Sequence, residues 1–500
     1  MSRPRLGRPY KLPAQTLIYA RGMSGHVPAN PLLPGFQGYE LSPSYYDEAL
    51  APPMTPRPQY ARLLRSLEGV DLADLAHATK RAVDRRGVRF RSRDGYVPFK
   101  LDPIPRIFPR EEWDRLAAGL VQRARALNAF AADCYGERRI VAAGRVPGRV
   151  LEGAEHFEPE MAGVVGPGAV YAGVLGFDLV RDSDGVLKVL EDNARTPSGL
   201  AYAQAALEAI DEVLPLAPEA RLDADERWSA LADVLRAAAP EGVEKPEVAL
   251  LSDGPANSAW WEHEWIAAAL EIPVVTLDIL ETRGDRLYAR IDGRQRRLDV
   301  VYRRTDEDRI HDTSGKLSPW AEAVLGPLKA GRLSCVNTPG AGIADDKLVH
   351  AYVPEMIRFY LDEQPLLASV RTYDLAQPDQ RAECIERIDE MVIKPRSGHG
   401  GHGVIVCAHA HREDRDRAAR QIDAEPERYV AQELVALSRH PTAQGAELRP
   451  RHVDLRPFVL TAGDRVAALP GGLTRVAFAP GALVVNSSQD GGAKATWVLR

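Results

Sequence analysis

The pattern of apolar and polar positions divides the chain into segments of different kinds. In residues 59–150 the apolar positions recur at spacings of three, four or their sums, which predicts helices with one buried face. The clearest series is Trp113, Leu116, Leu120, Leu127 and Ala131. Residues 1–58 are rich in proline, glycine and tyrosine, and we expect an irregular arm that packs over another part of the chain. Residues 215–245 are charged and rich in alanine and proline, which indicates a helix and a linker.

The remaining segments alternate strands with helices or loops, which indicates an α/β fold. Residues 151–214 begin with strand-like alternation and end in a helix, and residues 336–500 alternate strands with loops. Residues 246–335 contain a strand, a helix and a second strand, the order of a βαβ unit. The three elements are Val248–Leu251, Ser258–Leu270 and Val274–Leu277. The first turn of this unit lacks Gly-x-Gly-x-x-Gly, so we expect no nicotinamide dinucleotide there.

A glycine-rich loop between two apolar runs, within Met391–Cys407, carries the strongest chemical signal. Glycines let the backbone bring several N–H donors close to one anion, and a lysine at the loop entrance adds a point charge for phosphate. The residues after the loop are β-branched and have no helical period, so we expect the tip of a hairpin and not the turn of a P-loop. The candidate nucleotide-binding residues are Lys394, Ser397, Gly398, Gly400, Gly401 and Gly403.

Other classes of protein with such a glycine-rich hairpin fit this sequence less well. A protein kinase also covers its nucleotide with a glycine-rich hairpin, but the sequence has no His-Arg-Asp and no Asp-Phe-Gly. His399 and His402 lie in the loop without the helical geometry or further ligands of a zinc site, so we expect them to touch phosphate or solvent. A glycine-rich surface hairpin without a ligand stays as the alternative.

A second hairpin is predicted upstream of this loop. Asp184-Gly185 is a hairpin turn signal between two apolar runs. In the strand that follows, Glu191 and Asn193 point to one face and Asp192 points to the other. If the turn holds an even number of residues, Asp178 on the first strand shares that face with Glu191. Two carboxylates and one amide on one face suit a hard cation such as Mg²⁺, whereas an exposed polar strand face is the alternative.

Composition and charge limit the class of protein. The 500 residues are 45% hydrophobic, which is enough for several domains with apolar cores. The formal net charge of −6 argues against a nucleic-acid partner. Four cysteines without a Cys-x-x-Cys pair indicate buried thiols in a reducing compartment. No apolar run reaches the ~18 residues of a membrane span and no signal peptide is recognisable, so we expect a cytoplasmic protein without a membrane partner.

Leu190–Asn193 followed by Thr196–Gly199 resembles the Glu-x-Asn metal motif of ATP-grasp ligases such as D-alanine–D-alanine ligase. In ordinary ATP-grasp enzymes this hairpin follows the glycine flap, whereas here it precedes the flap, which is the mark of a circular permutation. The chain is identified as a member of the circularly permuted type 2 ATP-grasp family, which is related to glutathionylspermidine synthase. The matching stretches cover nearly the whole chain: Tyr39–Leu41, Asp102–Arg106, Leu190–Gly199, Ala344–Lys347, the flap, Arg451–Leu460, Pro470–Val476 and Val485–Gln489.

The resemblance implies a circularly permuted ATP-grasp fold with a βαβ substrate domain and an N-terminal helical region. In order, the expected units are the arm 1–58, the helical region 59–150, the ATP-grasp segment with the metal hairpin 151–214, the charged linker 215–245, the pre-ATP-grasp-like substrate domain 246–335, and the ATP-grasp segment with the flap and adenine hinge 336–500.

The resemblance also assigns the nucleotide site. Lys394 corresponds to the flap lysine near the α-phosphate and the adenine edge, and Lys347 corresponds to the earlier lysine of the ATP site. Asp178, Glu191 and Asn193 correspond to the metal ligands. The strand Tyr429–Val435 resembles the hinge that contacts adenine, although on sequence alone it is only a strand. The hinge residues assigned to adenine are Gln432, Glu433 and Leu434.

Arginines near these motifs are candidates for binding the reacting groups. His452, Asp454 and Arg456 alternate onto one strand face, and an arginine beside a phosphate site suits a developing acyl phosphate. The residues assigned to catalysis are Arg456, Arg475 and Arg195. Salt bridges within the sheet are the alternative for Arg456 and Arg475.

Three further residues are assigned to the substrate. Arg303 and Arg304, after the predicted strand Leu298–Tyr302, could bind a carboxylate in bidentate fashion or could be surface charges. Asp454 is assigned to the substrate as well.

These features predict Mg²⁺ and ATP-dependent ligation of a carboxylate to an amine. A carboxylate attacks the γ-phosphate, and an amine captures the acyl phosphate to give an amide, ADP and phosphate. A phosphotransferase and a catalytically silent ATP-binding scaffold are the alternatives. The resemblance implies small-molecule or peptide substrates and, as a separate polypeptide, an alpha-E-type or transglutaminase-like partner.

Overall fold

The computed structural model describes residues 35–92, 95–165, 170–214, 221–222, 226–306, 309–397, 403–479, 482 and 491–500. Several predicted features lie outside these ranges: residues 1–34 of the arm, the loop tip with Gly398, His399, Gly400, Gly401 and His402, and the stretch Val485–Gln489. Within the described chain, no helix is both long and apolar enough to cross a membrane.

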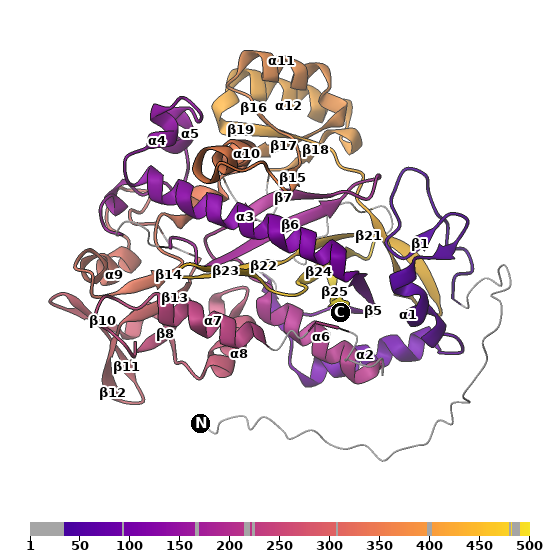
Figure 1. Ribbon diagram of the computed structural model, residues 1–500, viewed down its shortest axis with the longest axis horizontal. Coiled ribbons are helices and arrows are strands. Elements are labelled where there is room, and N and C mark those ends of the chain that lie inside the picture. The colour runs from indigo at the N-terminus through magenta and orange to yellow at the C-terminus, as the bar shows by residue number, and fades with distance from the viewer. Residues whose placement is uncertain are drawn as a thin grey trace.

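One large mixed sheet forms the centre of the molecule (Figure 1). In the described residues it has ten strands, and its main path runs β15-β7-β6-β21-β24-β25-β5, with β20 paired to β21 and the β22–β23 hairpin paired to β6. The bounds are β5 Leu101–Phe108, β6 Val174–Arg181, β7 Leu187–Asn193, β15 Ala368–Ser369, β20 Arg439–Gln444, β21 Glu447–Arg456, β22 Phe458–Ala462, β23 Arg465–Ala468, β24 Leu473–Ala477 and β25 Gly491–Val498. Strands from opposite ends of the sequence are therefore neighbours, as a permuted chain requires.

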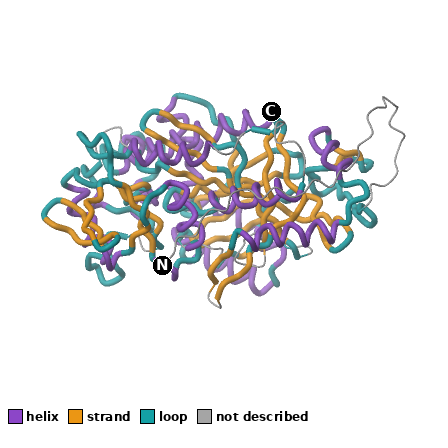
Figure 2. The backbone as a smooth tube through the Cα atoms, turned by 90° about the horizontal axis from the view of Figure 1, so that it is seen from below, coloured by secondary structure: helices purple, strands orange, loops and turns teal. Residues whose placement is uncertain are grey.

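Helices cover both faces of this sheet. The long helix α3 (Arg110–Cys134) lies across one face, and its residues Trp113, Leu116, Leu120, Leu127 and Ala131 are all buried, which confirms the predicted helix face (Figure 1). Helices α2 (Leu72–Arg85) and α6 (Leu200–Val213) pack on the other face, against β5 and β25. Figure 2 shows the strands running through the middle with helices on either side.

The predicted helical region 59–150 contains strands as well, which corrects the sequence analysis. Besides α1 (Ala61–Ser66), α2, α3, α4 (Arg139–Ala142) and α5 (Gly148–Glu152), it holds the hairpin β3 (Arg89–Ser92) and β4 (Gly95–Pro98) and the sheet strand β5. β5 pairs in parallel with β25 and is buried along almost its whole length. Such a strand lacks the alternation by which a half-exposed strand is recognised.

The arm also contains short regular elements. Two-residue strands β1 (Leu50–Ala51) and β2 (Thr55–Pro56) pair with each other, and Phe36, Tyr39 and Tyr60 are buried in a cluster shared with α1, α2 and β5. The described part of the arm thus packs over the large sheet, as expected.

Residues 246–335 form the predicted βαβ domain. β8 (Val248–Ser252), α8 (Trp260–Leu270) and β9 (Val274–Val275) make the βαβ unit, and the parallel sheet has the order β14-β13-β8-β9. The other elements are the meander β10 (Leu280–Arg283), β11 (Arg286–Ile291) and β12 (Arg294–Leu298), strand β13 (Val300–Arg304), helix α9 (Pro319–Lys329) and strand β14 (Ser334–Val336). Arg303 and Arg304 therefore lie inside β13 and not after a strand. The predicted charged linker contains helix α7 (Glu226–Ala237).

A smaller lobe at the top of Figure 1 carries the glycine-rich hairpin; we call residues 372–433 the flap lobe. Its sheet has the order β16-β19-β17-β18, with bounds β16 Thr372–Asp374, β17 Met391–Pro395, β18 Ile405–Val406 and β19 Tyr429–Glu433. Helices α11 (Pro378–Glu386) and α12 (Arg412–Ala424) pack on it over an apolar core of its own. β17 and β18 pair in antiparallel fashion, which confirms the predicted hairpin. Helix α10 (Lys347–Leu361) contacts both β16 and α3.

Candidate active site

The β6–β7 hairpin brings the predicted metal-binding residues to one face. Asp178 lies directly opposite Glu191, and Gly176 lies opposite Asn193. The Asn193 amide nitrogen is 3.5 Å from Asp178 Oδ1, and Gly185 takes a positive φ of 84° in the connecting turn. The hairpin and the shared face are therefore present as predicted, but not through a turn with an even number of residues. Five residues, 182–186, separate the paired Arg181 and Leu187, and a β-bulge between Asp178 and Leu179 brings Asp178 opposite Glu191.

Two arginines bind Asp178. Arg456 on β21 donates from Nε and Nη2 to its two oxygens at 2.6 and 2.8 Å, and Arg475 on β24 donates to Oδ2 at 2.8 Å. Arg475 also binds Asp454, its register partner across β21 and β24, and its Nε donates to Asp454 Oδ1 at 2.9 Å. The within-sheet ion pairs are thus present, and they are made with the hairpin aspartate itself.

This cluster of two carboxylates and two guanidinium groups is buried, and its charges compensate one another. Burial would raise the pKa of Asp178, but the Arg456 and Arg475 guanidinium groups outweigh it and hold that pKa well below the usual range. Burial keeps the pKa of Asp454 above its ordinary value despite Arg475. Burial also acts against the charge of Arg475, but its two aspartate partners raise its pKa.

Two lysines approach Glu191 from different elements. Lys394 on β17 places Nζ 3.2 Å from Glu191 Oε1, and its side chain is buried. Lys347 is the first residue of α10, whose N-terminus is capped by Asp346. Burial lowers the pKa of Lys347; Glu191 opposes this effect and Lys394 adds to it. Two ammonium groups beside one half-buried carboxylate form a local excess of positive charge that suits an oligophosphate.

The predicted hinge residues face in different directions. Gln432 on β19 donates to the Leu190 carbonyl at 3.1 Å and to Thr372 Oγ1 at 2.8 Å, while its Oε1 is buried without a hydrogen-bond partner in the described structure. Glu433 turns away to accept from Tyr373 at 3.0 Å. The Leu434 amide donates to the Glu390 carbonyl at 2.8 Å. Gln432 is therefore the hinge residue with an open polar atom beside β7.

Arg195 lies beyond the end of β7, next to a histidine that the sequence analysis did not identify. Its backbone N–H donates to Asp345 Oδ1 at 3.1 Å, its Nε lies 3.8 Å from Asp345 Oδ2, and its guanidinium contacts the ring of His156. A Cβ on Gly342 would stand 2.7 Å from the His156 Cβ and 2.8 Å from the Arg195 Cγ, so glycine makes this approach possible. A single histidine in a loop gives no sequence signal for such a contact.

Arg303 and Arg304 are buried, which excludes the surface-charge interpretation. Arg303 donates to the Asn337 carbonyl at 3.2 Å. Arg304 donates to the Pro197 carbonyl at 2.8 Å and lies 3.2 Å from Glu262. The structure therefore places Arg304 under the Thr196–Gly199 loop and not beside Asp178.

Two polar residues that the sequence analysis missed hold the loop after β7. Glu262 Oε1 accepts from the N–H groups of Gly199 and Ala201, both at 2.9 Å, where α6 begins. The Asn337 side chain donates to the Val174 and Ala194 carbonyls at 2.7 and 2.6 Å and accepts from the Val174 N–H at 2.9 Å. Glu262 comes from the βαβ domain and Asn337 directly follows its last strand, β14, so both became recognisable only once the fold placed these segments against β6 and β7.

A cavity of about 380 Å³ lies elsewhere, in the βαβ domain. Residues 240–245 line it together with Arg286, Arg297 and Arg332. It shares no residue with the cluster around Asp178 and Glu191, so it adds nothing to that site.

Comparisons with known proteins agree with this arrangement. The model of the family "Circularly permuted ATP-grasp type 2" matches residues 105–477. A protein of Frankia alni named "Putative glutamate--cysteine ligase 2-3" is 43% identical over 469 residues, which cover 92% of this chain and 54% of that protein. An uncharacterized protein of Synechocystis sp. is 38% identical over 477 residues, covering 91% of this chain and 97% of its own length.

The fold has a solved counterpart. A glutathione synthetase-like effector from Globodera pallida superposes with a TM-score of 0.56 at 14% identity, over 86% of this chain and 97% of that chain. The present chain spans about half the length of the Frankia relatives that it matches. From the family match, the relatives and the permuted sheet, this chain belongs to the circularly permuted type 2 ATP-grasp family and has that α/β fold.

Proposed function

We propose that this chain is an ATP-dependent ligase that joins a carboxylate to an amine in an amide or peptide-like bond. The observation that supports it best is the meeting of Lys394 and Lys347 at Glu191, next to the buried Asp178–Arg456–Arg475 cluster. Lys394 from the flap lobe and Lys347 from α10 both lie next to Glu191 of the β6–β7 hairpin. Such a group of cations beside a carboxylate can orient a triphosphate.

In the proposed reaction, Lys394 and Lys347 bind the phosphates of ATP while the open Oε1 of Gln432 accepts a hydrogen bond from the base. The substrate carboxylate attacks the γ-phosphorus, the bond to the β-phosphate oxygen breaks and ADP leaves. The amine then attacks the acyl carbon, and phosphate departs with the electrons of the C–O bond. We assign to Arg456 and Arg475, which bind Asp178, the stabilisation of the charge that develops on the transferred phosphate. Closure of the flap hairpin keeps water from the acyl phosphate.

Glu191 and Asn193, with Asp178, would hold Mg²⁺, which supplies charge neutralisation on the phosphates. The fit rests on hard oxygen donors sharing one strand face. Among the described residues no three His, Cys, Asp or Glu side chains form a metal cluster, so an amide or a phosphate must complete the ligand set. Because Asp178 is already bound by two arginines, we assign the main metal contact to Glu191, whose side chain is 35% exposed.

The names of the Frankia relatives support an amino-acid substrate. Both contain the words "glutamate--cysteine ligase", an activity that joins a carboxylate to an amine. We therefore include glutamate and cysteine among the substrates to be tested. A partner of alpha-E or transglutaminase-like type, and a cytoplasmic location, remain predictions.

The test is incubation of the purified chain with Mg²⁺, ATP and a mixture of amino acids. We expect ADP release and, by mass spectrometry, a product equal to two substrates minus one water. Glu191→Gln should abolish both, whereas Glu281→Gln, a matched change on the exposed meander strand β10, should leave both unchanged.

Other outcomes would overturn the proposal in different ways. A phosphorylated product that forms without any amine would indicate a phosphotransferase. ATP binding without ADP release in any mixture would favour a non-catalytic scaffold.

A further inference from the structure

Two segments of the chain connect the flap lobe to the large sheet. The first runs from β15 to β16: the Val370 amide donates to the Val189 carbonyl at 2.8 Å on the sheet side, and the Arg371 carbonyl accepts from Glu433 at 3.0 Å on the lobe side. The second runs from β19 to β20 through residues 434–438, and we call this segment the lobe link.

The lobe link is fixed at both ends. On the lobe side, the Leu434 amide donates to the Glu390 carbonyl at 2.8 Å. On the sheet side, the Leu437 carbonyl lies 2.8 Å from His452 Nδ1, and the Ser438 amide donates to the Arg181 carbonyl at 2.9 Å. Between them, Val435 and Ala436 make no backbone hydrogen bond to any described residue. The backbone can therefore change direction at these two residues without breaking a backbone hydrogen bond of their own.

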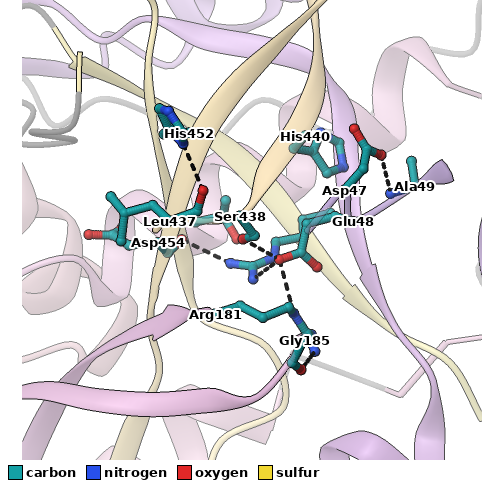
Figure 3. Close-up of polar contacts among 12 residues, drawn as sticks. Asp47, Glu48, Ala49, Arg181, Gly185, Leu437, Ser438, His440, His452 and Asp454 are labelled. Carbon is teal, nitrogen blue, oxygen red and sulfur yellow. Dashed lines mark hydrogen bonds and ion pairs between the residues drawn. The ribbon is translucent and has the colours of Figure 1, made fainter. Parts of the chain in front are cut away.

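A buried carboxylate from the arm binds the sheet end of this link (Figure 3). Glu48 Oε1 accepts from Ser438 Oγ at 2.6 Å, from Arg106 at 2.5 Å and from Arg181 at 3.0 Å, and Glu48 is 3% exposed. The Glu48 amide donates to the Arg439 carbonyl at 2.8 Å, so backbone and side chain hold adjacent residues.

The charge of Glu48 is maintained by its partners. Burial alone would raise the pKa of Glu48, but the Arg106 and Arg181 guanidinium groups lower it to about 2. Charge-assisted hydrogen bonds of this kind are stronger and shorter than neutral ones. Because Arg106 and Arg181 hold the Glu48 carboxylate in this way, the acceptor of the Ser438 hydroxyl is fixed in place.

The same carboxylate reaches the strands that bear the candidate active site. Arg181 ends β6, the strand of Asp178, and also binds Glu112 of α3 at 2.6 Å and the Gly185 carbonyl at 2.8 Å. Arg106 donates from Nη1 to the backbone carbonyl of Asp454 at 3.1 Å. Through Ser438, Arg181 and Arg106, Glu48 thus connects the lobe link to β6 and β21. Glu48 itself lies away from the candidate phosphate-binding side chains.

We propose that Glu48 is a positioning residue that fixes the sheet end of the lobe link. The flap lobe then pivots at Val435–Ala436 and closes in a defined position relative to Asp178 and Glu191. The effect of Glu48 on turnover rests on the proposed function, but its effect on the link does not. No sequence pattern indicates this role, because a single glutamate in an irregular arm has no recognisable motif or spacing.

Two variants separate the link contact from the ion pairs. Ser438→Ala removes only the hydroxyl that reaches Glu48, and Glu48→Gln removes the charge that Arg106 and Arg181 neutralise. Asp299→Asn is the control, since Asp299 is also a buried carboxylate that accepts a backbone N–H and pairs with an arginine, but in the βαβ domain.

Hydrogen exchange of the ligand-free protein is the first measurement. We expect both variants to raise the exchange rates of the amides of residues 438 and 439 by at least about tenfold, which corresponds to the loss of one charge-assisted hydrogen bond. Asp299→Asn should leave these rates unchanged. ATP binding, measured by calorimetry, should weaken several-fold in both variants, and the KM for ATP should rise more than kcat falls.

Two results would overturn the proposal. Exchange at Ser438 and Arg439 that stays within twofold of the wild type would show that Glu48 does not hold the link. Increased exchange with unchanged ATP affinity would show that the link does not control closure. If the wild-type chain binds no ATP, the proposed function fails, and the exchange measurement still decides the role of Glu48.

Discussion

At the scale of single residues, Gly176 shows how little space the candidate site leaves. It lies two residues before Asp178 on the same strand face, and a Cβ there would stand 2.8 Å from the Pro197 Cβ and 3.6 Å from the Arg456 Cδ. The absence of a side chain therefore lets Pro197 approach β6 closely, whereas the added Cβ would only be in ordinary contact with Arg456.

Gly176→Ala should destabilise the protein and displace Pro197 in the loop that follows β7. Overpacking a close contact costs about 1–3 kcal/mol, and we expect a loss of that size in chemical unfolding together with reduced ADP release. Gly326→Ala is the matched control, because Gly326 lies in α9 with no atom within 4 Å of the added Cβ. That change should be neutral or stabilising, since alanine favours a helix over glycine by about 1 kcal/mol. Equal effects of the two substitutions would contradict the packing argument.

Lys394→Met should weaken ATP binding while preserving the fold. The substitution keeps a long apolar stem but removes the ammonium group beside Glu191, and losing a charge-assisted contact costs on the order of 1–3 kcal/mol. Calorimetry should show this as a loss of about five- to 150-fold in affinity. Lys188→Met, on the neighbouring strand β7, removes a half-exposed lysine that pairs with Asp182 and should leave ATP affinity unchanged. If both variants bind ATP like the wild type, the flap lysine is not a phosphate ligand.

Single residues also show where sequence reasoning succeeds. The shared face of Glu191 and Asn193 was predictable from strand periodicity, whereas Asp178 joins that face only through a β-bulge that the sequence pattern did not predict. The binding of Asp178 by Arg456 and Arg475 was not predictable either, because it depends on β21 and β24 lying near β6 in the sheet, which local pattern does not encode.

At the scale of elements, strands buried on both faces were the hardest to recognise. β5 contains Pro103 and Pro105, and α3 begins two residues after its end, so its apolar residues resemble the start of the helical region. The hairpins β6–β7 and β17–β18 were found because turn residues separate their strands. The capping of α6 by Glu262 was missed, since the cap comes from another domain and not from the residues just before the helix.

The packing of β8 against α8 should make the protein sensitive to acid. His263 in α8 is buried, with Nδ1 2.8 Å from Ser252 Oγ at the end of β8, and burial together with Arg304 lowers its pKa to about 2. The folded protein resists protonation there, whereas the unfolded chain titrates near pH 6.5. This contribution to stability is complete above pH 6.5 and is lost as the pH falls toward 2.

Between pH 7.5 and pH 5, His263 should therefore reduce the free energy of unfolding by about 2 kcal/mol. His263→Asn keeps a polar group near Ser252 but cannot be charged, so its stability should fall less over the same range. Urea unfolding of both proteins at several pH values measures the difference. Burial lowers the pKa of His350 and His440 as well, so only the difference between the two proteins reports on His263. Parallel pH profiles would contradict the assignment.

At the scale of the whole molecule, the permutation places the two ends of the fold side by side. The order of the metal hairpin and the flap was enough to predict the permuted family, because order along the chain is visible in the sequence. The parallel pairing of β5 with β25 was not predicted, although β5 contains the family stretch Asp102–Arg106. In the structure, Asp102 at the start of β5 and Lys494 on β25 form a fully buried ion pair.

This pair should hold the ends of the fold together. Lys494 Nζ also donates to the Pro441 carbonyl at 3.0 Å, and Asp102 Oδ2 accepts from the Ala443 amide at 2.7 Å, so the two charges join β5, β25 and β20. Burial acts against the charged form of both side chains, raising the pKa of Asp102 and lowering that of Lys494. Removing one partner therefore leaves the other in an apolar surrounding.

Lys494→Met should destabilise the protein by about 3–5 kcal/mol, the cost of an unpaired buried charge. Adding Asp102→Asn removes the remaining carboxylate charge, so the double variant should regain part of that loss. Chemical unfolding of the two single variants and the double variant gives the coupling energy directly. The exposed pair Arg85–Glu212 provides the comparison, and its coupling should stay below about 1 kcal/mol. Additive losses at Asp102 and Lys494 would mean that β5 and β25 are held together by their strand pairing and by apolar packing, and not by this ion pair.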